Sequence, residues 1–165
     1  MVTVTHLWVH APAGDRLRNT LLNTRDLLMR HGTDTITPNR HRGLFEEALM
    51  ALKGGRATPD MQQIMLDAVL NSETPDRAVF STPTFMGAPG RVVRQAGRDP
   101  LMRARAAALA NLFPDHDVEF FLAMRNPATL IAEVLPVFTG GGYHVLMQGR
   151  HPLDLRWRTP IQALL

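Results

Sequence analysis

The order of apolar and polar residues along the chain predicts strands that alternate with helices. Apolar residues alternate with threonines over residues 1–5 and run continuously over 7–9, a pattern typical of a buried strand. A second, short strand is expected at 77–81, and the apolar run VEFFLAM predicts a third, fully buried strand over 118–124. Apolar residues at helical spacing predict helices between and before these strands, over 15–31, 44–52, 58–69 and 99–112.

Strands that are separated by helices form parallel sheets, because a parallel connection needs a crossover. We therefore expect an α/β fold with three layers, a parallel sheet that carries helices on both faces. With 165 residues, of which 45% are hydrophobic, the chain fits one domain over residues 1–165. Such sheets bind ligands beyond the carboxyl ends of their strands, which here are residues 9–16, 81–90 and 124–133.

The last residues resemble the start of a further helix. Thr159 is a suitable cap, Pro160 suits the first helical position and Gln162 follows the cap by three residues, yet only three residues come after it. So short a helix cannot stand alone, since the cost of nucleation is not recovered. We expect the chain to be the N-terminal portion of a longer fold, truncated at its C-terminus. The alternative is that this end packs on a partner, such as another copy of the chain.

Composition removes several classes of function. The chain has no cysteine, which excludes disulfides and thiolate metal sites, and no histidine or carboxylate motif predicts a metal. The net charge of +3 is spread along the chain without a block of cations, so we expect no nucleic-acid partner. No apolar run is long enough for a membrane span and no signal peptide is recognisable, which predicts a cytoplasmic protein without a membrane partner.

Arg125 is the first candidate for binding chemistry. It directly follows the apolar run 118–124, and after it Asn126 can cap a helix that begins at Pro127. A guanidinium beside a helix N-terminus, at the edge where the strands end, suits a bound phosphate. The alternative is that Arg125 pairs with a carboxylate or caps the carbonyls of a neighbouring helix, and the sequence leaves both interpretations open.

The segment FFLAMRNPA over 120–128 resembles the strand-to-helix segment by which sulfotransferases hold the 3′-phosphate of their sulfate donor, 3′-phosphoadenosine-5′-phosphosulfate (PAPS). Other short pieces similar to bacterial sulfotransferase-like proteins occur in matching order: His6, Thr24-Arg25-Asp26 with Leu28 and Gly32, the turn over 81–87, and Phe113-Pro114. The resemblance implies a P-loop type of fold, with PAPS or its product PAP as cofactor. It also implies transfer of a sulfuryl group to a hydroxyl or amine of a small-molecule or glycan acceptor.

The chain departs from this family in the loop after the first strand. That loop should carry a lysine that grips the 5′-phosphosulfate, but the only lysine of the chain is Lys53, far from this loop in sequence. Pro12 removes a backbone donor, and Asp15, which we expect to cap the first helix, places negative charge where an anion would bind. The serine that usually follows the phosphate-binding arginine by about eight residues is replaced by Glu133.

A working enzyme would therefore need other residues in place of the lysine. His10, as general base or cation, and Arg16 are the candidate catalytic residues. The alternatives are that His10 is a partly buried structural histidine and that Arg16 is a solvated surface arginine. We expect Arg16 and Arg18 in the first turn of the first helix. The candidate cofactor-binding residues are Gly14, Arg18, Arg125, Asn126 and Pro127. The alternative function is that of a non-catalytic relative of the same fold, which acts as a binding or assembly module.

Overall fold

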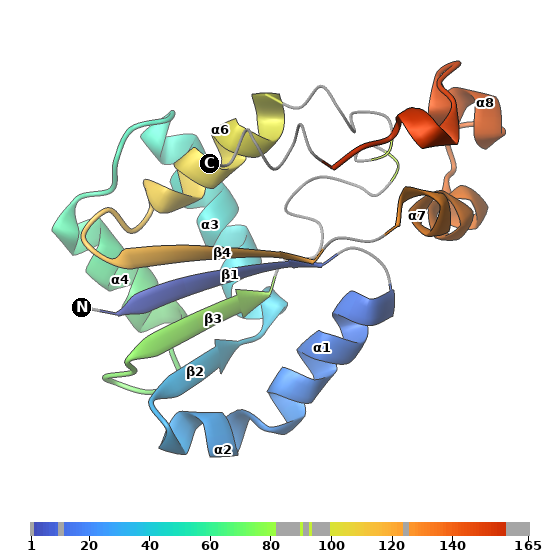
Figure 1. The fold of residues 1–165 in the computed structure, drawn as a ribbon. Helices are drawn as coiled ribbons and strands as arrows, with labels where there is room; N and C mark the ends of the chain where they lie inside the picture. The colour runs from blue at the N-terminus through green and yellow to red at the C-terminus, as the bar shows by residue number, and fades with distance from the viewer. Residues whose placement is uncertain are drawn as a thin grey trace.

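The computed structural model describes residues 2–9, 12–81, 90, 93, 100–123 and 126–157, with the backbone alone described at 5–9, 12–15 and 100–102. The elements follow one another as strands and helices along the chain (Figure 1). They are β1 (Thr3–Val9), α1 (Pro12–Asn23), α2 (Arg25–Arg30), β2 (Thr33–Ile36), α3 (Pro38–Leu52), α4 (Pro59–Val69), β3 (Arg77–Ser81), α6 (Pro100–Ala110), β4 (Asp117–Ala123), α7 (Pro127–Val134) and α8 (Gly142–Met147), with short 3-10 helices η1 (Leu135–Val137) and η2 (Pro152–Asp154).

The four strands form one parallel sheet in the order β2-β3-β1-β4. The first strand therefore lies inside the sheet, between β3 and β4, and β2 forms one edge. All strands end on the same side, where Val9 of β1 pairs with Ala123 of β4 and Leu7 of β1 pairs with Ser81 of β3. This arrangement confirms the predicted α/β class with a parallel sheet.

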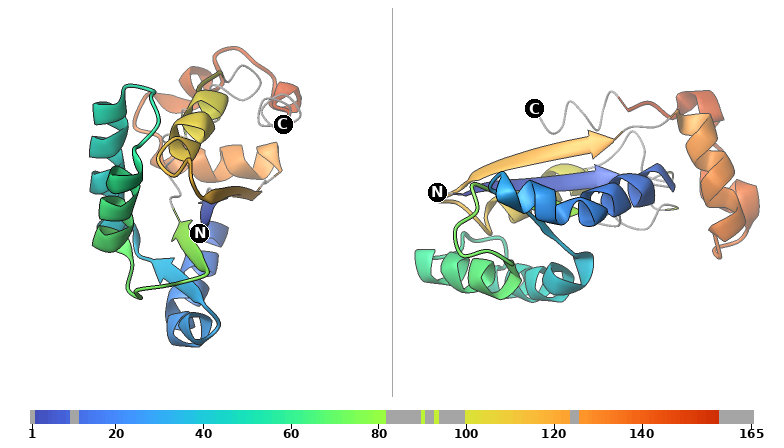
Figure 2. Two further views of the ribbon diagram at one scale, coloured as in Figure 1. Left: turned by 90° about the vertical axis from the view of Figure 1, so that its left-hand side faces the viewer. Right: turned by 90° about the horizontal axis from the view of Figure 1, so that it is seen from below.

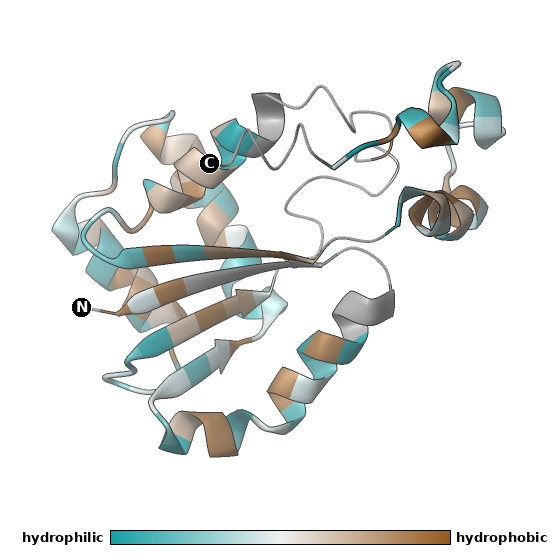
Figure 3. Cartoon of the chain, in the orientation of Figure 1, coloured by the Kyte–Doolittle hydropathy of each residue, from teal (hydrophilic) through white to brown (hydrophobic). Residues whose placement is uncertain are grey.

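Helices lie on both sides of the sheet. Figure 2 shows α3 and α4 on one side and α1 on the other. The side with α3, α4 and α6 holds the main core, in which Phe80 of β3 and Val4 of β1 are fully buried against the helices. Phe45, Phe80 and Phe113 meet there with ring centroids 5.0–6.3 Å apart, at the separations that favour aromatic pairs. The hydropathy colouring of Figure 3 shows the matching apolar segments along β3 and β4.

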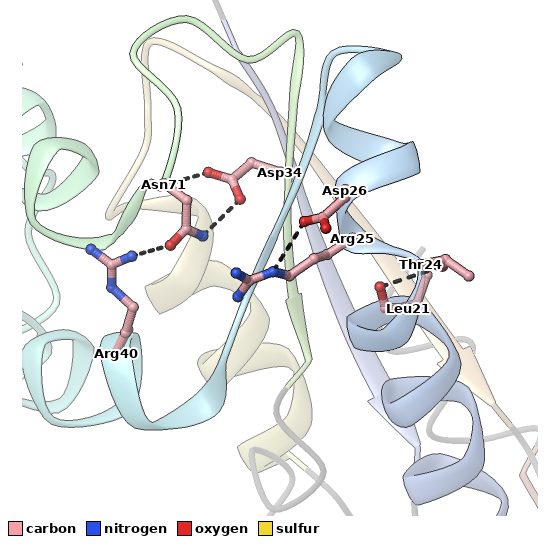
Figure 4. A network of polar contacts seen from close by, with 7 residues as sticks. All are labelled: Leu21, Thr24, Arg25, Asp26, Asp34, Arg40 and Asn71. Atoms are coloured by element: carbon pink, nitrogen blue, oxygen red, sulfur yellow. Dashed lines mark hydrogen bonds and ion pairs between the residues drawn. The ribbon is translucent and has the colours of Figure 1, made fainter.

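The structure adds a strand that the sequence analysis missed. Residues 33–36 form β2, which pairs with β3 from Thr33 against Arg77 to Ile36 against Phe80. Asp34, whose side chain is unfavourable in strands, is fully buried there because its carboxylate accepts hydrogen bonds from the backbone N–H groups of Asn71 and Ser72 and from the Asn71 side chain (Figure 4). Asn71 and Ser72 lie 37 and 38 residues away from Asp34 in sequence, so no local sequence pattern predicts these hydrogen bonds.

The predicted helix over 15–31 is two helices. It begins at Pro12 rather than after Asp15, and it is interrupted at Thr24 between α1 and α2. The hydroxyl and the backbone N–H of Thr24 both donate to the carbonyl of Thr20, at 2.8 and 3.0 Å. Such back-bonding by a threonine often bends helices, although Thr20 makes the same bond to Arg16 inside α1 without a break. The prediction of Asp15 as the cap was therefore wrong, because its backbone lies inside the first helix.

The helix predicted over 44–52 begins earlier than expected, because α3 starts at Pro38, which occupies the first helical position after Thr37. The start of the helix predicted over 58–69 agrees more closely. Thr58 caps α4 by accepting a hydrogen bond from the N–H of Met61, and Pro59 occupies the first helical position. The start of α6 follows Asp99, which lies outside the described residues, as does the predicted helix start at 159–162. β4 begins and ends one residue earlier than the strand predicted at 118–124.

Candidate functional site

The carboxyl ends of β1 and β4 form the candidate site. Val9 and Ala123 pair as the last residues of these neighbouring strands, and each strand is followed within a few residues by a helix. α1 begins at Pro12 and α7 begins at Pro127, so two helix N-termini follow the ends of two paired strands (Figure 1). Because helix N-termini carry partial positive charge and exposed N–H groups, this edge of the sheet favours an anion.

The start of α7 has the predicted cap. The side-chain oxygen of Asn126 accepts a hydrogen bond of 2.9 Å from the N–H of Ala128, and its carbonyl accepts one of 3.0 Å from the N–H of Leu130. Pro127 occupies the first helical position, where its missing N–H costs nothing. Asn126 and Pro127 thus shape the helix start as predicted, and an anion at this helix would bind beside the Asn126 side chain or displace it.

The start of α1 differs from the prediction. Only residues 10 and 11 separate the end of β1 from Pro12, whereas the sequence analysis placed a loop of several residues before Asp15. Gly14 therefore lies in the first turn of α1 and is part of the helix. Arg16 and Arg18 lie in the second turn, which corrects their predicted position in the first.

The predicted site residues are thus only partly placed. Gly14, Arg16 and Arg18 come from α1, and Asn126 and Pro127 from the start of α7. The Arg16 side chain is exposed, whereas that of Arg18 is half-buried. His10 and Arg125 lie outside the described residues. Glu133, at the position where sulfotransferases usually have a serine, lies near the C-terminal end of α7 and is half-buried.

A buried histidine near the same edge has no counterpart in the sequence analysis. His41 lies in the second turn of α3, the helix that follows the carboxyl end of β2, and only 1% of it is exposed. Its ring contacts Phe45 and Phe80, with centroids 5.3 and 5.1 Å away. Burial lowers the pKa of His41 from 6.5 to about 4, and the hydrogen bond with the carbonyl of Thr37 only partly opposes this.

The tautomer of His41 follows from its backbone contact. The Nδ1 atom lies 3.0 Å from the Thr37 carbonyl oxygen, which can only accept, so Nδ1 carries the proton of the neutral ring. His41 is therefore a neutral core residue at pH 7. The sequence signal for His41 was a histidine on the apolar face of a helix. The helix was predicted to begin at Leu44, so His41 fell outside it.

The described part of the chain contains neither a group of side chains suited to a metal ion nor a membrane-spanning helix. Among its residues, no three histidine, aspartate or glutamate side chains gather in a group that could hold a metal ion. None of the helices it contains is both long and apolar enough to span a membrane.

Comparisons with known proteins give no relative for this chain. No family model, no curated protein and no solved structure matches it. The site residues, the sheet topology and the sequence resemblance are therefore the only basis for assigning a function.

Proposed function

We propose that the chain is a sulfotransferase-like protein that binds PAPS or PAP at the carboxyl ends of β1 and β4. The observation that carries the proposal is the pair of helix starts that follow Val9 and Ala123, because it offers positive potential for two phosphate groups. With β3 between β1 and β2, the strand order differs from the two doubly wound orders in which β1 and β2 are neighbours.

In this proposal the two helix starts hold the two ends of the nucleotide. Arg125 and the helix start at Asn126 and Pro127 bind the 3′-phosphate, with the guanidinium as a fork of donors. Gly14 and Arg18 of α1 meet the 5′ end. Arg16 takes the place of the absent lysine, and a neutral His10 accepts the proton of the acceptor hydroxyl or amine as the sulfuryl group passes from PAPS to the acceptor and PAP leaves; in the alternative, His10 is itself the cation and takes no proton.

The second candidate is a non-catalytic relative that acts as a binding or assembly module. One observation favours it: the connection between β1 and α1 consists of residues 10 and 11 alone. A loop of two residues offers few N–H groups to surround a phosphate, and the following residue, Pro12, has none. This candidate predicts no affinity for the nucleotide.

Thermal unfolding in the presence of PAP separates the two candidates. A ligand at 100 times its Kd stabilises the native state by about 2.7 kcal/mol, which for a domain of this size raises Tm by roughly 5–10 °C. Adenosine 5′-phosphate, which lacks the 3′-phosphate, should give a smaller shift. If PAP at millimolar concentration leaves Tm unchanged, the sulfotransferase-like proposal is wrong.

Two arginine variants test which residue is responsible for the shift in Tm that PAP causes. Arg125→Ala should remove most of the difference between PAP and adenosine 5′-phosphate, because that difference reports the 3′-phosphate. Arg56→Ala is the matched control, since Arg56 is an exposed arginine in the turn between α3 and α4, away from the proposed site. Equal loss of the PAP shift in both variants would mean that the binding is non-specific attraction to cations.

A further inference from the structure

Residues 126–157 form a C-terminal unit with a small core of its own. The unit comprises α7, η1, α8 and η2, whose main contacts are with one another. Its core consists of side chains that are almost fully buried: Leu130, Ile131, Val134, Leu146, Met147 and Leu155. Figures 1 and 2 show α7 and α8 beyond the ends of the strands, separate from the helices that flank the sheet.

The core of the C-terminal unit also includes one residue from a distant part of the chain. Val93, which follows β3 in sequence, is fully buried in this second core and not in the main one. The guanidinium of Arg150 donates to the carbonyl of Val93 at 3.1 Å, and its Nε donates to the carbonyl of Met147 at 3.3 Å. Arg150 thus joins the end of α8 to the chain that follows β3.

Phe138 makes a second connection of the same kind. A Cβ atom added at Gly90 would lie 2.7 Å from the Phe138 ring, and one added at Gly140 would lie 2.5 Å from it. The ring therefore packs directly against the backbone of both glycines, one after β3 and one inside the C-terminal unit. No side chain larger than hydrogen fits at Gly90 unless Phe138 moves.

The C-terminal unit and the main core share a further contact. The half-buried Trp157 packs against the clusters of both. Since cooperative units in proteins follow the boundaries of their packed cores, two separate clusters joined by a few contacts predict two separate opening events.

We propose that the C-terminal unit, together with Gly90 and Val93, forms one cooperative unit that opens and closes beyond the carboxyl ends of the strands independently of the sheet. Phe138 and Arg150 are its positioning residues, because they fix the chain after β3 to this unit. The consequence for ligand binding rests on the proposed function: PAP binds when this unit is closed, because the helix start at Asn126 and Pro127 belongs both to the unit and to the proposed site.

Native-state hydrogen exchange tests the cooperative unit without any ligand. The amides of Val93, Leu130 and Leu146 should exchange through a common opening that leaves the amides of β1 and β3 protected. Phe138→Leu should speed the exchange of all three together by about tenfold or more, with the sheet unchanged. Protection of Val93 that follows β3 instead of α7 would overturn the proposal.

A size-compensating pair of variants tests the role of Phe138. Gly90→Ala places a methyl group against the Phe138 ring and should speed amide exchange in the C-terminal unit by about tenfold. The double variant Gly90→Ala with Phe138→Leu should restore most of the protection that Gly90→Ala removes. Gly43→Ala is the matched control, because a Cβ at this glycine of α3 meets nothing within 4 Å. Additive losses in the double variant would show that Phe138 does not position Gly90.

The same variants connect the unit to the proposed site. If the proposal holds, Gly90→Ala weakens PAP binding several-fold and Gly43→Ala does not, with a partial recovery in the double variant. A wild-type protein that fails to bind PAP refutes the proposed function, while the exchange measurements still decide whether the unit exists. Binding of PAP with equal affinity by Gly90→Ala and the wild type would refute the requirement for a closed unit.

Discussion

The buried His41 should make the protein lose stability in mildly acidic solution. The folded state keeps the ring neutral down to about pH 4, because burial lowers the pKa, while the unfolded chain takes up the proton near pH 6.5. Above pH 6.5 both states are neutral and His41 contributes no pH dependence. Between pH 6.5 and 4 the unfolded state binds more protons, so the free energy of unfolding falls as the pH is lowered.

The size of this loss follows from the interval between the two pKa values. Each pH unit below 6.5 costs about 1.4 kcal/mol, so the loss reaches about 2 kcal/mol at pH 5 and levels off near 3 kcal/mol below pH 4. A domain of this length has a total stability of about 5–15 kcal/mol, which makes the loss easy to measure. Urea unfolding of the wild type and of His41→Phe at pH 7, 6 and 5 is the assay.

The difference in unfolding free energy between these two proteins isolates His41, because the carboxylates contribute equally to both. His41→Phe should be less stable than the wild type at pH 7 by about 1 kcal/mol, since the hydrogen bond with Thr37 is lost. This deficit should vanish or reverse by pH 5. His31→Gln, at the exposed histidine that ends α2, is the control and should retain the wild-type profile. A deficit that stays constant from pH 7 to 5 would refute the reasoning.

Three further predictions concern stability. Phe80→Ala should cost about 3–5 kcal/mol because the ring is fully buried, whereas Phe121→Ala, at a half-exposed position of β4, should cost less than half as much in the same urea unfolding experiment. Asp34→Asn should lower the free energy of unfolding by about 2–4 kcal/mol, since the amide turns a donor toward N–H groups that need an acceptor (Figure 4). Asp26→Asn is the control: it breaks only an exposed ion pair with Arg25 and should lower the free energy of unfolding by less than about 1 kcal/mol. Asn126→Ala should cost about 1 kcal/mol and speed amide exchange in α7 with no change in β4.

Local signals made some elements predictable from the sequence. The run over 118–124 is apolar enough to identify a buried strand without knowledge of its neighbours, and Asn126-Pro127 combines two signals of a helix start. Thr58-Pro59 is a case of the same kind. Each of these predictions depends on residues that lie within a few positions of one another, and the structure places the helix starts where they were expected.

Elements that depend on distant partners were missed. β2 has only four residues and contains Asp34. The carboxylate of Asp34 can be buried only because the backbone N–H groups of Asn71 and Ser72 donate hydrogen bonds to it. The threonines and isoleucine between Gly32 and Pro38 were a usable signal of a short strand, but the aspartate counts against it. The burial of His41 likewise depends on a distant residue, because its ring packs against Phe80 of β3.

The candidate site was predictable only as a region. The rule that ligands bind where parallel strands end selected the residues after β1, β3 and β4, and the sheet brings the first and last of these together. The length of the connection after β1 was not predictable, since Asp15 and Pro12 are both acceptable helix starts. The structure begins the helix at Pro12, and this choice shortens the loop and moves Arg16 and Arg18 one turn into the helix.

In the proposed function, the binding of the nucleotide and the transfer of the sulfuryl group depend on different residues. An anion needs only a helix start and a cation, and both are present after β4 if Arg125 faces the edge. Sulfuryl transfer also needs a cation at the bridging oxygen, and the chain offers two candidates near α1. His10, the first candidate, lies outside the described residues. Arg16 lies about 6 Å along the helix from Pro12, but helical side chains point back toward the N-terminus, so a guanidinium there can cover this distance. If Arg16 is this cation, Arg16→Ala should abolish any sulfuryl transfer that the protein performs while PAP binding through Arg125 persists. Unchanged transfer would leave the role to His10, and loss of both together would place Arg16 among the binding residues instead.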